Sequence, residues 1–227
     1  MLSPQQIKQL VAQQAVKLVE NNMIVGLGSG TTAYWFTMAL AERVKGGLNI
    51  QGIPTSKQIK QLAIDNGIPV KELNDITGID ITVDGADEVD EQLQLIKGGG
   101  GALLQEKMVA TASKQVVIIA DYTKLVKQLG KFPLPVEVVP YGWKQAQRII
   151  EQRYAIVTSL REKEGRPFVT DHGHYILDCN FQHITHAAAL HTELNAIPAV
   201  VENGLFIQLA KKVIIGYADG RIEEISA

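Results

Sequence analysis

The chain has 227 residues, of which 46% are hydrophobic and 20% charged, and its formal net charge at pH 7 is -2. This composition is typical of a globular protein and lacks the basic excess that duplex nucleic acid demands, so no nucleic acid partner is expected. No apolar run approaches the roughly 20 residues of a membrane span, and no signal-peptide pattern opens the chain. We therefore expect a cytoplasmic protein with no membrane partner, and the single cysteine, Cys179, excludes an internal disulfide.

Strands and helices alternate through the first half of the chain. The segment "SPQQ" at residues 3–6 predicts a capped first helix that ends near Asn21 and Asn22. A strand over residues 23–27, a glycine loop and a helix from Thr31 onward then form a β-loop-α unit. The same rhythm returns in "LNIQGI", "IDITVDGAD" and "QVVIIAD". The fold class expected is therefore α/β, a mostly parallel, Rossmann-like sheet flanked by helices.

The pattern changes after "LGKFPLPVEVVP", where three prolines punctuate a short segment. We place a domain boundary near Gly130 and expect a second, smaller α+β domain beyond it. Its predicted elements are a helix over 142–152, a strand over 155–160, a hairpin that turns at 171–174 and a helix over 185–197. The tail "KKVIIGYADGRIEEIS" predicts another hairpin, with its turn at residues 218–220.

The first candidate site is the loop "GSGTT" at residues 28–32, between a strand and a helix. Free N–H groups at the helix start, the helix dipole and three hydroxyls make an anion site that suits phosphate. Two other interpretations remain open. One is a tight turn with Ser and Thr as caps. The other is a dinucleotide fingerprint formed by Gly28, Gly30 and Ala33, which is weak because no acidic residue clearly ends the second strand.

The second candidate is "ITVDGADEVD", in which a buried-looking strand ends at Asp84 and Asp87 follows a glycine turn. Ligands of open α/β sheets bind beyond the carboxyl ends of strands, so Asp84 is placed for a site. The two carboxylates are suited to bind Mg²⁺, to move protons or only to cap a turn. The acidic residues Glu88, Asp90 and Glu91 are expected on a solvated face.

The third candidate is "LIKGGGGALLQEK", in which Lys97 precedes four glycines and a helix that starts near residues 101–103. Glycines are costly to order, so four in a row indicate a sharp bend or a close approach of backbone to a ligand. Glu106 falls in the first or second turn of the helix, as a catalytic residue or as a surface glutamate that the dipole favours. Together the three segments suit proton transfer next to a carbonyl on a phosphorylated substrate, without a redox cofactor.

The histidines offer a rival site. His172, His174, His183 and His186 fall close together in the smaller predicted domain, and His191 follows on the helix of His186. Imidazoles at this density are compatible with a transition metal, but there is no cysteine pair and no sign of an open coordination geometry. Histidines at the surface or in the hairpin turn are the favoured alternative.

These segments resemble the ribose-5-phosphate isomerase family of the A type. The matching stretches, in the family's order and across nearly the whole chain, are "GLGSGTTA", "IPTSKQIKQLA", "VDGADEVD", "IKGGGGALLQEK", "IADYTKLV", "LGKFPLPVEV" and "VTDHGHYILD". The resemblance implies interconversion of ribose 5-phosphate and ribulose 5-phosphate in the pentose phosphate pathway, through ring opening and an enediolate. It implies a small-molecule sugar phosphate as ligand and neither a metal nor an organic cofactor.

The resemblance also implies roles for residues at matching positions. Glu106 resembles the general base that moves the proton between C2 and C1, and Asp84 and Lys97 resemble the family's other catalytic pair. The implied substrate-binding residues are Ser29, Gly30, Thr31, Thr32, Asp84, Gly85, Ala86, Asp87, Lys97, Gly98, Gly99, Gly100 and Lys124, with Lys8 as a further phosphate contact.

The family's architecture implies a large catalytic domain over 1–129 plus 207–227, a small α+β domain over 130–206, and a homodimer or homotetramer. One departure is visible, because His172 and His174 stand where the family usually has asparagines. Two other functions are weighed against the isomerase. A regulatory module that only binds sugar phosphates is disfavoured by the joint presence of Glu106, Asp84 and Lys97. An aminosugar-phosphate deaminase or CoA-transferase-like enzyme is disfavoured by the long ordered motifs.

Overall fold

The computed structural model of the chain describes residues 1–226. Contacts divide these residues into two compact units. Unit 1 comprises Met1–Ala86, Gln105–Leu125 and the chain from Gln208 onward, whereas unit 2 comprises Asp87–Leu104 and Val126–Ile207. No helix among the described residues is both long and apolar enough to cross a membrane.

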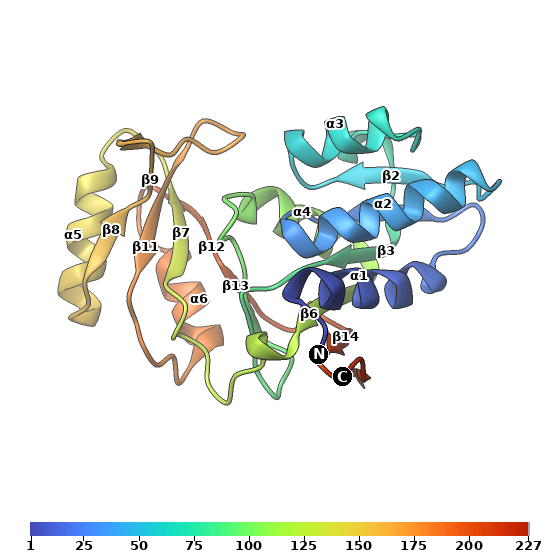
Figure 1. Cartoon of the computed structure of the whole chain (residues 1–227). Coiled ribbons are helices and arrows are strands. Elements are labelled where there is room, and N and C mark those ends of the chain that lie inside the picture. The colour runs from blue at the N-terminus through green and yellow to red at the C-terminus, as the bar shows by residue number, and fades with distance from the viewer. Residues whose placement is uncertain (227) are drawn as a thin grey trace. The chain divides into compact units, whose positions relative to one another are not determined.

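Unit 1 is built on a six-stranded sheet with the order β15-β14-β6-β3-β1-β2. Strands β2, β3, β6 and β14 of this sheet are labelled in Figure 1. The strands are β1 (Ile24–Leu27), β2 (Gln51–Pro54), β3 (Ile79–Asp84), β6 (Ser113–Asp121), β14 (Lys212–Gly216) and β15 (Ile222–Ser226). Neighbouring strands are parallel except β15, which pairs with β14 in the predicted tail hairpin. The predicted α/β class with a mostly parallel sheet is confirmed.

Four α-helices accompany this sheet, namely α1 (Pro4–Ala15), α2 (Thr31–Lys45), α3 (Lys57–Asp65) and α4 (Leu103–Thr111). The predicted capping box is present, because the Ser3 hydroxyl and the Gln6 side chain each accept a backbone N–H of the other residue. The first helix ends earlier than expected, since a 3-10 turn, η1 (Val16–Leu18), follows Ala15. The main core joins α1, α2 and α3 to one sheet face through residues such as Val11, Phe36, Leu40, Val83, Ile119 and Ile214.

Unit 2 contains an antiparallel sheet with the order β12-β7-β11-β8, accompanied by α5 (Trp143–Tyr154) and α6 (Ala187–Asn195). Its strands are β7 (Leu134–Val138), β8 (Thr158–Leu160), β11 (Tyr175–Cys179) and β12 (Val200–Asn203). A three-stranded sheet joins β4 (Glu88–Val89), β5 (Leu95–Ile96) and β13 (Leu205–Phe206), and a two-stranded ribbon joins β9 (Glu162–Lys163) to β10 (Arg166–Pro167).

The predicted hairpin over residues 168–178 forms its turn, but the segments on either side of the turn do not pair as two strands. The Thr170 N–H donates to the His174 carbonyl, which closes the turn. The strand that follows, β11, pairs with β7 and β8 and not with residues 168–170. The prolines of "FPLPVEV" mark the change of pattern in the sequence, and Pro135 lies within β7, an inner strand of this sheet, where proline is unusual.

The compact units differ from the predicted domains in the segment Asp87–Leu104. That segment contains β4 and β5, and β5 pairs with β13, so its contacts lie in unit 2. The chain returns to unit 2 at Val126, whose N–H donates to the Val89 carbonyl, a few residues before the expected boundary at Gly130.

The expectation that Glu88 and Asp90 lie on a solvated face is wrong, whereas Glu91 is exposed. The Glu88 carboxylate accepts the N–H groups of Gly130 at 2.7 Å and Phe132 at 2.6 Å. Asp90 accepts the N–H groups of Gln92 and Gln94 in the turn between β4 and β5. Burial raises the pKa of Asp90, and these hydrogen bonds oppose the rise.

Replacing Glu88 by alanine is expected to lower the free energy of unfolding by about 3 kcal/mol. The change removes two charge-assisted hydrogen bonds and leaves the N–H groups of Gly130 and Phe132 without their acceptor. Urea unfolding measures the loss, with Glu91→Ala as the control because Glu91 is exposed. Equal stability of the two variants would contradict a structural role for the Glu88 carboxylate.

Candidate active site

The sheet of unit 1 changes direction between β1 and β3. From β1 the chain moves to the edge strand β2, and it then crosses back to β3 on the other side of β1. At such a switch point the loops that follow the two inner strands diverge and leave a crevice, in which open α/β sheets bind ligands. The loops concerned begin after Leu27 and at Asp84.

Asp84 holds these two loops together. Its Oδ1 atom accepts the Ser29 N–H at 3.1 Å and the Gly85 N–H at 2.7 Å. The side chain is 3% exposed. A carboxylate that accepts backbone N–H groups is fixed in orientation, so Asp84 presents a constant geometry at the edge of the sheet. Two residues after Asp84, at Ala86, this segment of unit 1 ends.

Hydroxyl groups gather on the other side of the same loop. The Ser29 hydroxyl lies 2.8 Å from both the Thr55 and the Ser56 hydroxyls, which follow β2. Ser56 caps α3 by accepting the Ile59 N–H, and the Thr55 hydroxyl donates to the Leu27 carbonyl. The sequence prediction missed Thr55 and Ser56 as site residues, although "PTSK" lies between a strand and a helix as "GSGTT" does.

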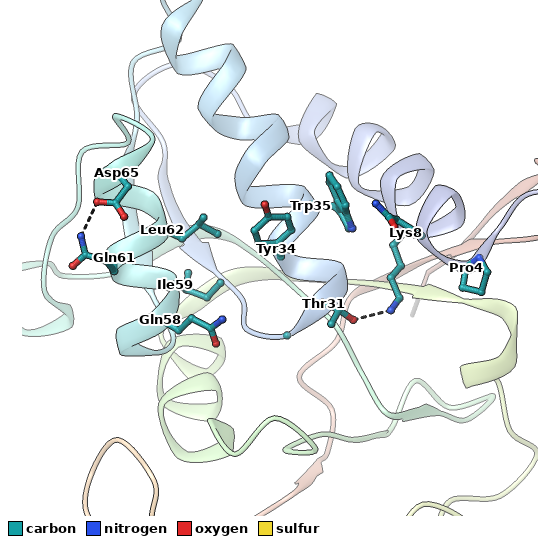
Figure 2. Close-up of a pocket in the computed structure, with 12 residues that line it drawn as sticks. Pro4, Lys8, Thr31, Tyr34, Trp35, Gln58, Ile59, Gln61, Leu62 and Asp65 are labelled. Atoms are coloured by element: carbon teal, nitrogen blue, oxygen red, sulfur yellow. Dashed lines mark hydrogen bonds between the residues drawn. The ribbon is translucent and has the colours of Figure 1, made fainter. Parts of the chain in front are cut away.

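The start of α2 supplies the anion-binding features expected of the loop. Gly30 caps the helix with a positive φ of 93°, and Thr31 and Thr32 form its first turn. The Lys8 amino group donates to the Thr31 hydroxyl at 2.8 Å, so a cation from α1 stands beside this helix start (Figure 2). Lys8 and Thr31 also line a cavity of about 820 Å³, together with residues that include Tyr34, Trp35, Ile59 and Leu62.

Glu106 lies in the first turn of α4 and is 4% exposed. The side chain of the preceding residue, Gln105, donates to the Pro54 carbonyl at 2.9 Å. Because Pro54 is the last residue of β2, this bond ties the first turn of α4 to the carboxyl edge of the sheet. Burial of Glu106 excludes the alternative of a surface glutamate.

Lys124 follows the next strand of the sheet. It ends η3 (Tyr122–Lys124), which begins directly after β6. The Asp121 carboxylate caps this turn by accepting the Thr123 N–H at 3.0 Å. Since β6 is the parallel neighbour of β3, Lys124 and Asp84 lie beyond the carboxyl ends of adjacent strands.

In unit 2, Lys97 directly follows β5 and is 3% exposed. Its N–H donates to the Gly204 carbonyl at 2.9 Å, and its amino group lies 5.4 Å from the centre of the Phe206 ring. A buried ammonium over an aromatic face gains cation–π stabilisation. Neither Gly204 nor Phe206 was predicted, because only the pairing of β5 with β13 brings them to Lys97.

Asp87 anchors the glycine segment within unit 2. Its Oδ2 atom accepts the Gly99 N–H at 2.8 Å, and its own N–H donates to the Ile96 carbonyl at 2.8 Å. Of the alternatives left open for this carboxylate, the structure therefore shows the turn-capping contact.

The four glycines have different reasons for lacking a side chain. Gly98 and Gly101 adopt positive φ values of 103° and 84°, which L-residues rarely adopt. A Cβ at Gly98 would lie 2.9 Å from the Leu103 side chain, one at Gly99 2.8 Å from the Asp87 carboxylate, and one at Gly101 2.5 Å from the Phe168 ring. At Gly100 a Cβ would meet nothing within 4 Å. Close approach of a ligand is therefore needed only to explain Gly100.

This difference predicts unequal stabilities for two alanine variants. Gly98→Ala is expected to lower the free energy of unfolding by about 1–2 kcal/mol because of its positive φ, before the contact with Leu103 is counted. Gly100→Ala is expected to stay within about 0.5 kcal/mol of the parent. Thermal or urea unfolding of both variants provides the measurement, and a stable Gly98→Ala variant would refute the conformational argument.

The histidines show no metal-binding arrangement within residues 1–226, where no group of three or more His, Cys, Asp or Glu side chains is placed to hold an ion. His174 Nδ1 instead lies 2.9 Å from the Glu137 carboxylate, which also accepts the Thr170 hydroxyl. His191 lies beside Asn203. At the end of β2, where a dinucleotide site would place an acidic residue, the chain has Pro54, Thr55 and Ser56.

The predicted site residues are thus divided between the units. Unit 1 brings Ser29, Gly30, Thr31, Thr32, Asp84, Gly85, Ala86, Glu106, Lys124 and Lys8 to the carboxyl edge of its sheet or the adjoining helix starts. Unit 2 holds Asp87, Lys97, Gly98, Gly99 and Gly100 in the turn that follows β5. The fold and these residues define an α/β protein whose polar side chains gather where parallel strands end.

The family profile of ribose 5-phosphate isomerase A (phosphoriboisomerase A) matches residues 51–220, and the chain belongs to that family. Ribose-5-phosphate isomerase A of Bacillus mycoides is 50% identical over 215 residues, which cover 94% of this chain and 97% of the relative. The same-named protein of Ruegeria pomeroyi is 50% identical over 230 residues, which cover 98% of this chain and 88% of the relative.

Two solved structures extend the likeness to the fold. Ribose 5-phosphate isomerase A from Methanocaldococcus jannaschii has a TM-score of 0.93 at 40% identity and covers 99% of this chain and 100% of its own. A D-ribose-5-phosphate isomerase in complex with phospho-erythronic acid has a TM-score of 0.96 at 38% identity, with both chains covered completely. The resemblance stated from the sequence motifs is confirmed.

Proposed function

We infer that this chain is an aldose-ketose isomerase that interconverts D-ribose 5-phosphate and D-ribulose 5-phosphate. The observation that carries the inference is its 50% identity, over nearly all of both chains, to proteins named ribose-5-phosphate isomerase A. Each unit supplies groups that the reaction needs. Unit 1 has an anion-binding helix start and a buried carboxylate at Glu106, and unit 2 has a buried ammonium at Lys97.

We assign the substrate phosphate to the loop from Ser29 to Thr32. The N–H groups at the start of α2 and the hydroxyls of Ser29 and Thr31 are suited to phosphate oxygens, and Lys8 adds a positive charge. The homologous structure with phospho-erythronic acid supports a sugar phosphate as ligand, because that acid carries a phosphate at one end and a carboxylate at the other.

Glu106 is assigned as the general base. Its carboxylate removes the proton from C2 of the open-chain aldose, the C2–H electron pair forms the C1–C2 double bond, and the C1=O1 π electrons move to O1 to give an enediolate. The protonated carboxyl group of Glu106 then donates a proton to C1 as the C2 carbonyl forms. Burial of the carboxylate suits this role, because a base largely shielded from water keeps the abstracted proton through most turnovers and exchanges it with solvent only in some.

Asp84 and Lys97 are assigned to the oxygen atoms of the reacting carbons. The positive charge of Lys97 stabilises the enediolate oxygen, and Asp84 moves protons between O1 and O2 and assists ring opening. The remaining proposed substrate contacts are the side chains of Lys124 and Asp87 and the backbone of Gly85, Ala86 and Gly98 to Gly100. The chemistry requires no metal and no organic cofactor.

We further propose that the protein acts in the cytoplasm, in the non-oxidative pentose phosphate pathway, as a homodimer or homotetramer. Light scattering during size-exclusion chromatography tests the assembly, and a monomeric mass at micromolar concentration would refute it.

The test of the function is to supply ribose 5-phosphate to the purified protein and to follow ribulose 5-phosphate, with and without a chelator. Turnover that the chelator does not change is expected. Loss of turnover only with the chelator would revive a metal-dependent mechanism. Binding of ribose 5-phosphate without turnover would instead indicate a regulatory module.

A further inference from the structure

Arg161 contacts the glycine segment through its guanidinium group. Its Nη1 atom donates to the Gly98 carbonyl at 2.7 Å and to the Gly99 carbonyl at 3.1 Å. All three residues belong to unit 2, and the arginine follows β8 directly. Arginine was not among the residues singled out in the sequence, which offers no signal that links position 161 to position 98.

The guanidinium is itself held in place from the other side. Its Nε and Nη2 atoms donate to the two carboxylate oxygens of Asp178 on β11, in a bidentate ion pair. The side chains are 14% and 22% exposed. The Arg161 backbone is also fixed, because its N–H donates to the Ile176 carbonyl and its carbonyl accepts the Phe168 N–H. Because the guanidinium is planar and the bidentate ion pair fixes its plane, the direction in which Nη1 donates is also fixed.

The two accepted carbonyls determine where the adjoining N–H groups point. In a trans peptide the C=O and N–H bonds point in opposite directions, so fixing a carbonyl aims the N–H of the next residue away from Arg161. The N–H that follows the Gly98 carbonyl belongs to Gly99 and donates to Asp87. The N–H that follows the Gly99 carbonyl belongs to Gly100, which donates no hydrogen bond to any residue within 1–226.

We propose that Arg161, gripped by Asp178, is a positioning residue that aims the Gly100 N–H at the developing enediolate oxygen. The proposal rests on the proposed isomerase function. It also accounts for the open space at Gly100. Among the four glycines of the described segment, only there would an added Cβ meet no protein atom within 4 Å, which leaves room for substrate. Lysine cannot replace this arginine, because one ammonium cannot grip a carboxylate in two places and hold two carbonyls at the same time.

The experiment compares Arg161→Ala and Arg161→Lys with the parent enzyme. We expect both variants to lower kcat for ribose 5-phosphate by about tenfold or more and to change KM less than about threefold. The loss should stay below the roughly 100-fold or larger effect of removing an oxyanion donor outright, since the Gly100 N–H remains present. Guanidinium chloride at millimolar concentration should restore part of the kcat of Arg161→Ala and none of that of Arg161→Lys.

Arg166→Ala is the matched control, because Arg166 is exposed and lies in the same part of unit 2. Near-parental kcat in Arg161→Lys would overturn the proposal. Loss of thermal stability in Arg161→Ala without guanidinium rescue would also overturn it, as it would indicate a purely structural contact. Failure of the parent protein to isomerise ribose 5-phosphate would refute the proposed function instead, and the two failures are therefore distinguishable.

Discussion

Replacing Glu106 by glutamine is expected to lower kcat for ribose 5-phosphate at least about 100-fold, with KM nearly unchanged. Glutamine keeps the size and the hydrogen-bonding reach of the side chain but cannot accept a proton from carbon. The buried position at the first turn of α4 is retained, so the proposed phosphate site at the start of α2 should bind substrate as before.

The control for this variant is Glu91→Gln, which removes one negative charge from an exposed position. Circular dichroism and binding of phospho-erythronic acid would establish that both variants are folded. Near-parental turnover of Glu106→Gln would show that another group removes the C2 proton.

Replacing Lys97 by methionine is expected to lower kcat by about 10²- to 10³-fold, the usual effect of removing a group that stabilises an oxyanion. Methionine keeps most of the length of the side chain and can still pack against the Phe206 ring, so the fold around β5 and β13 should persist. The variant loses the positive charge that we propose stabilises the negative charge developing on the enediolate.

Lys127→Met is the matched control, because Lys127 is an exposed lysine of the same unit. Steady-state kinetics separate the two parameters, and the loss in Lys97→Met should appear mainly in kcat. A rise in KM alone, with kcat retained, would show that Lys97 binds substrate and transition state equally and does not act in the chemical step.

Local signals in the sequence predicted the elements of unit 1 well. The capping box at Ser3 and Gln6, the helix start at Thr31 and the tail turn at Gly220 each depend on a few neighbouring residues, and each is present. The helix start at Leu103 lies within the predicted range, and of the two turns left open for Glu106 the structure shows the first.

Features that depend on distant pairing were missed. Pro135 would ordinarily argue against an inner strand, yet β7 pairs with both β11 and β12. The acidic residues around Glu88 in the sequence predict a solvated face, yet its buried carboxylate accepts N–H groups of residues more than 40 positions away, Gly130 and Phe132. No local pattern carries such information.

The candidate site shows the same division. Asp84, Lys97 and Glu106 stood out because they border strand ends and a glycine run. Phe206, Gly204 and Arg161 are tied to that run only through strand pairing and side-chain contacts. The sequence suggested a sharp bend or a close approach of ligand for the whole glycine run. In the structure, protein contacts or positive φ values account for three of the four glycines.

The most direct test of proton transfer by an enediolate is isomerisation in D₂O. The parent protein is predicted to incorporate deuterium at C1 of ribulose 5-phosphate as the reaction approaches equilibrium, because the proton held by Glu106 exchanges with solvent during some turnovers. Nuclear magnetic resonance of the product measures this incorporation. Full conversion with no deuterium on carbon, even after prolonged equilibration, would mean a direct hydride shift from C2 to C1 and would contradict the account.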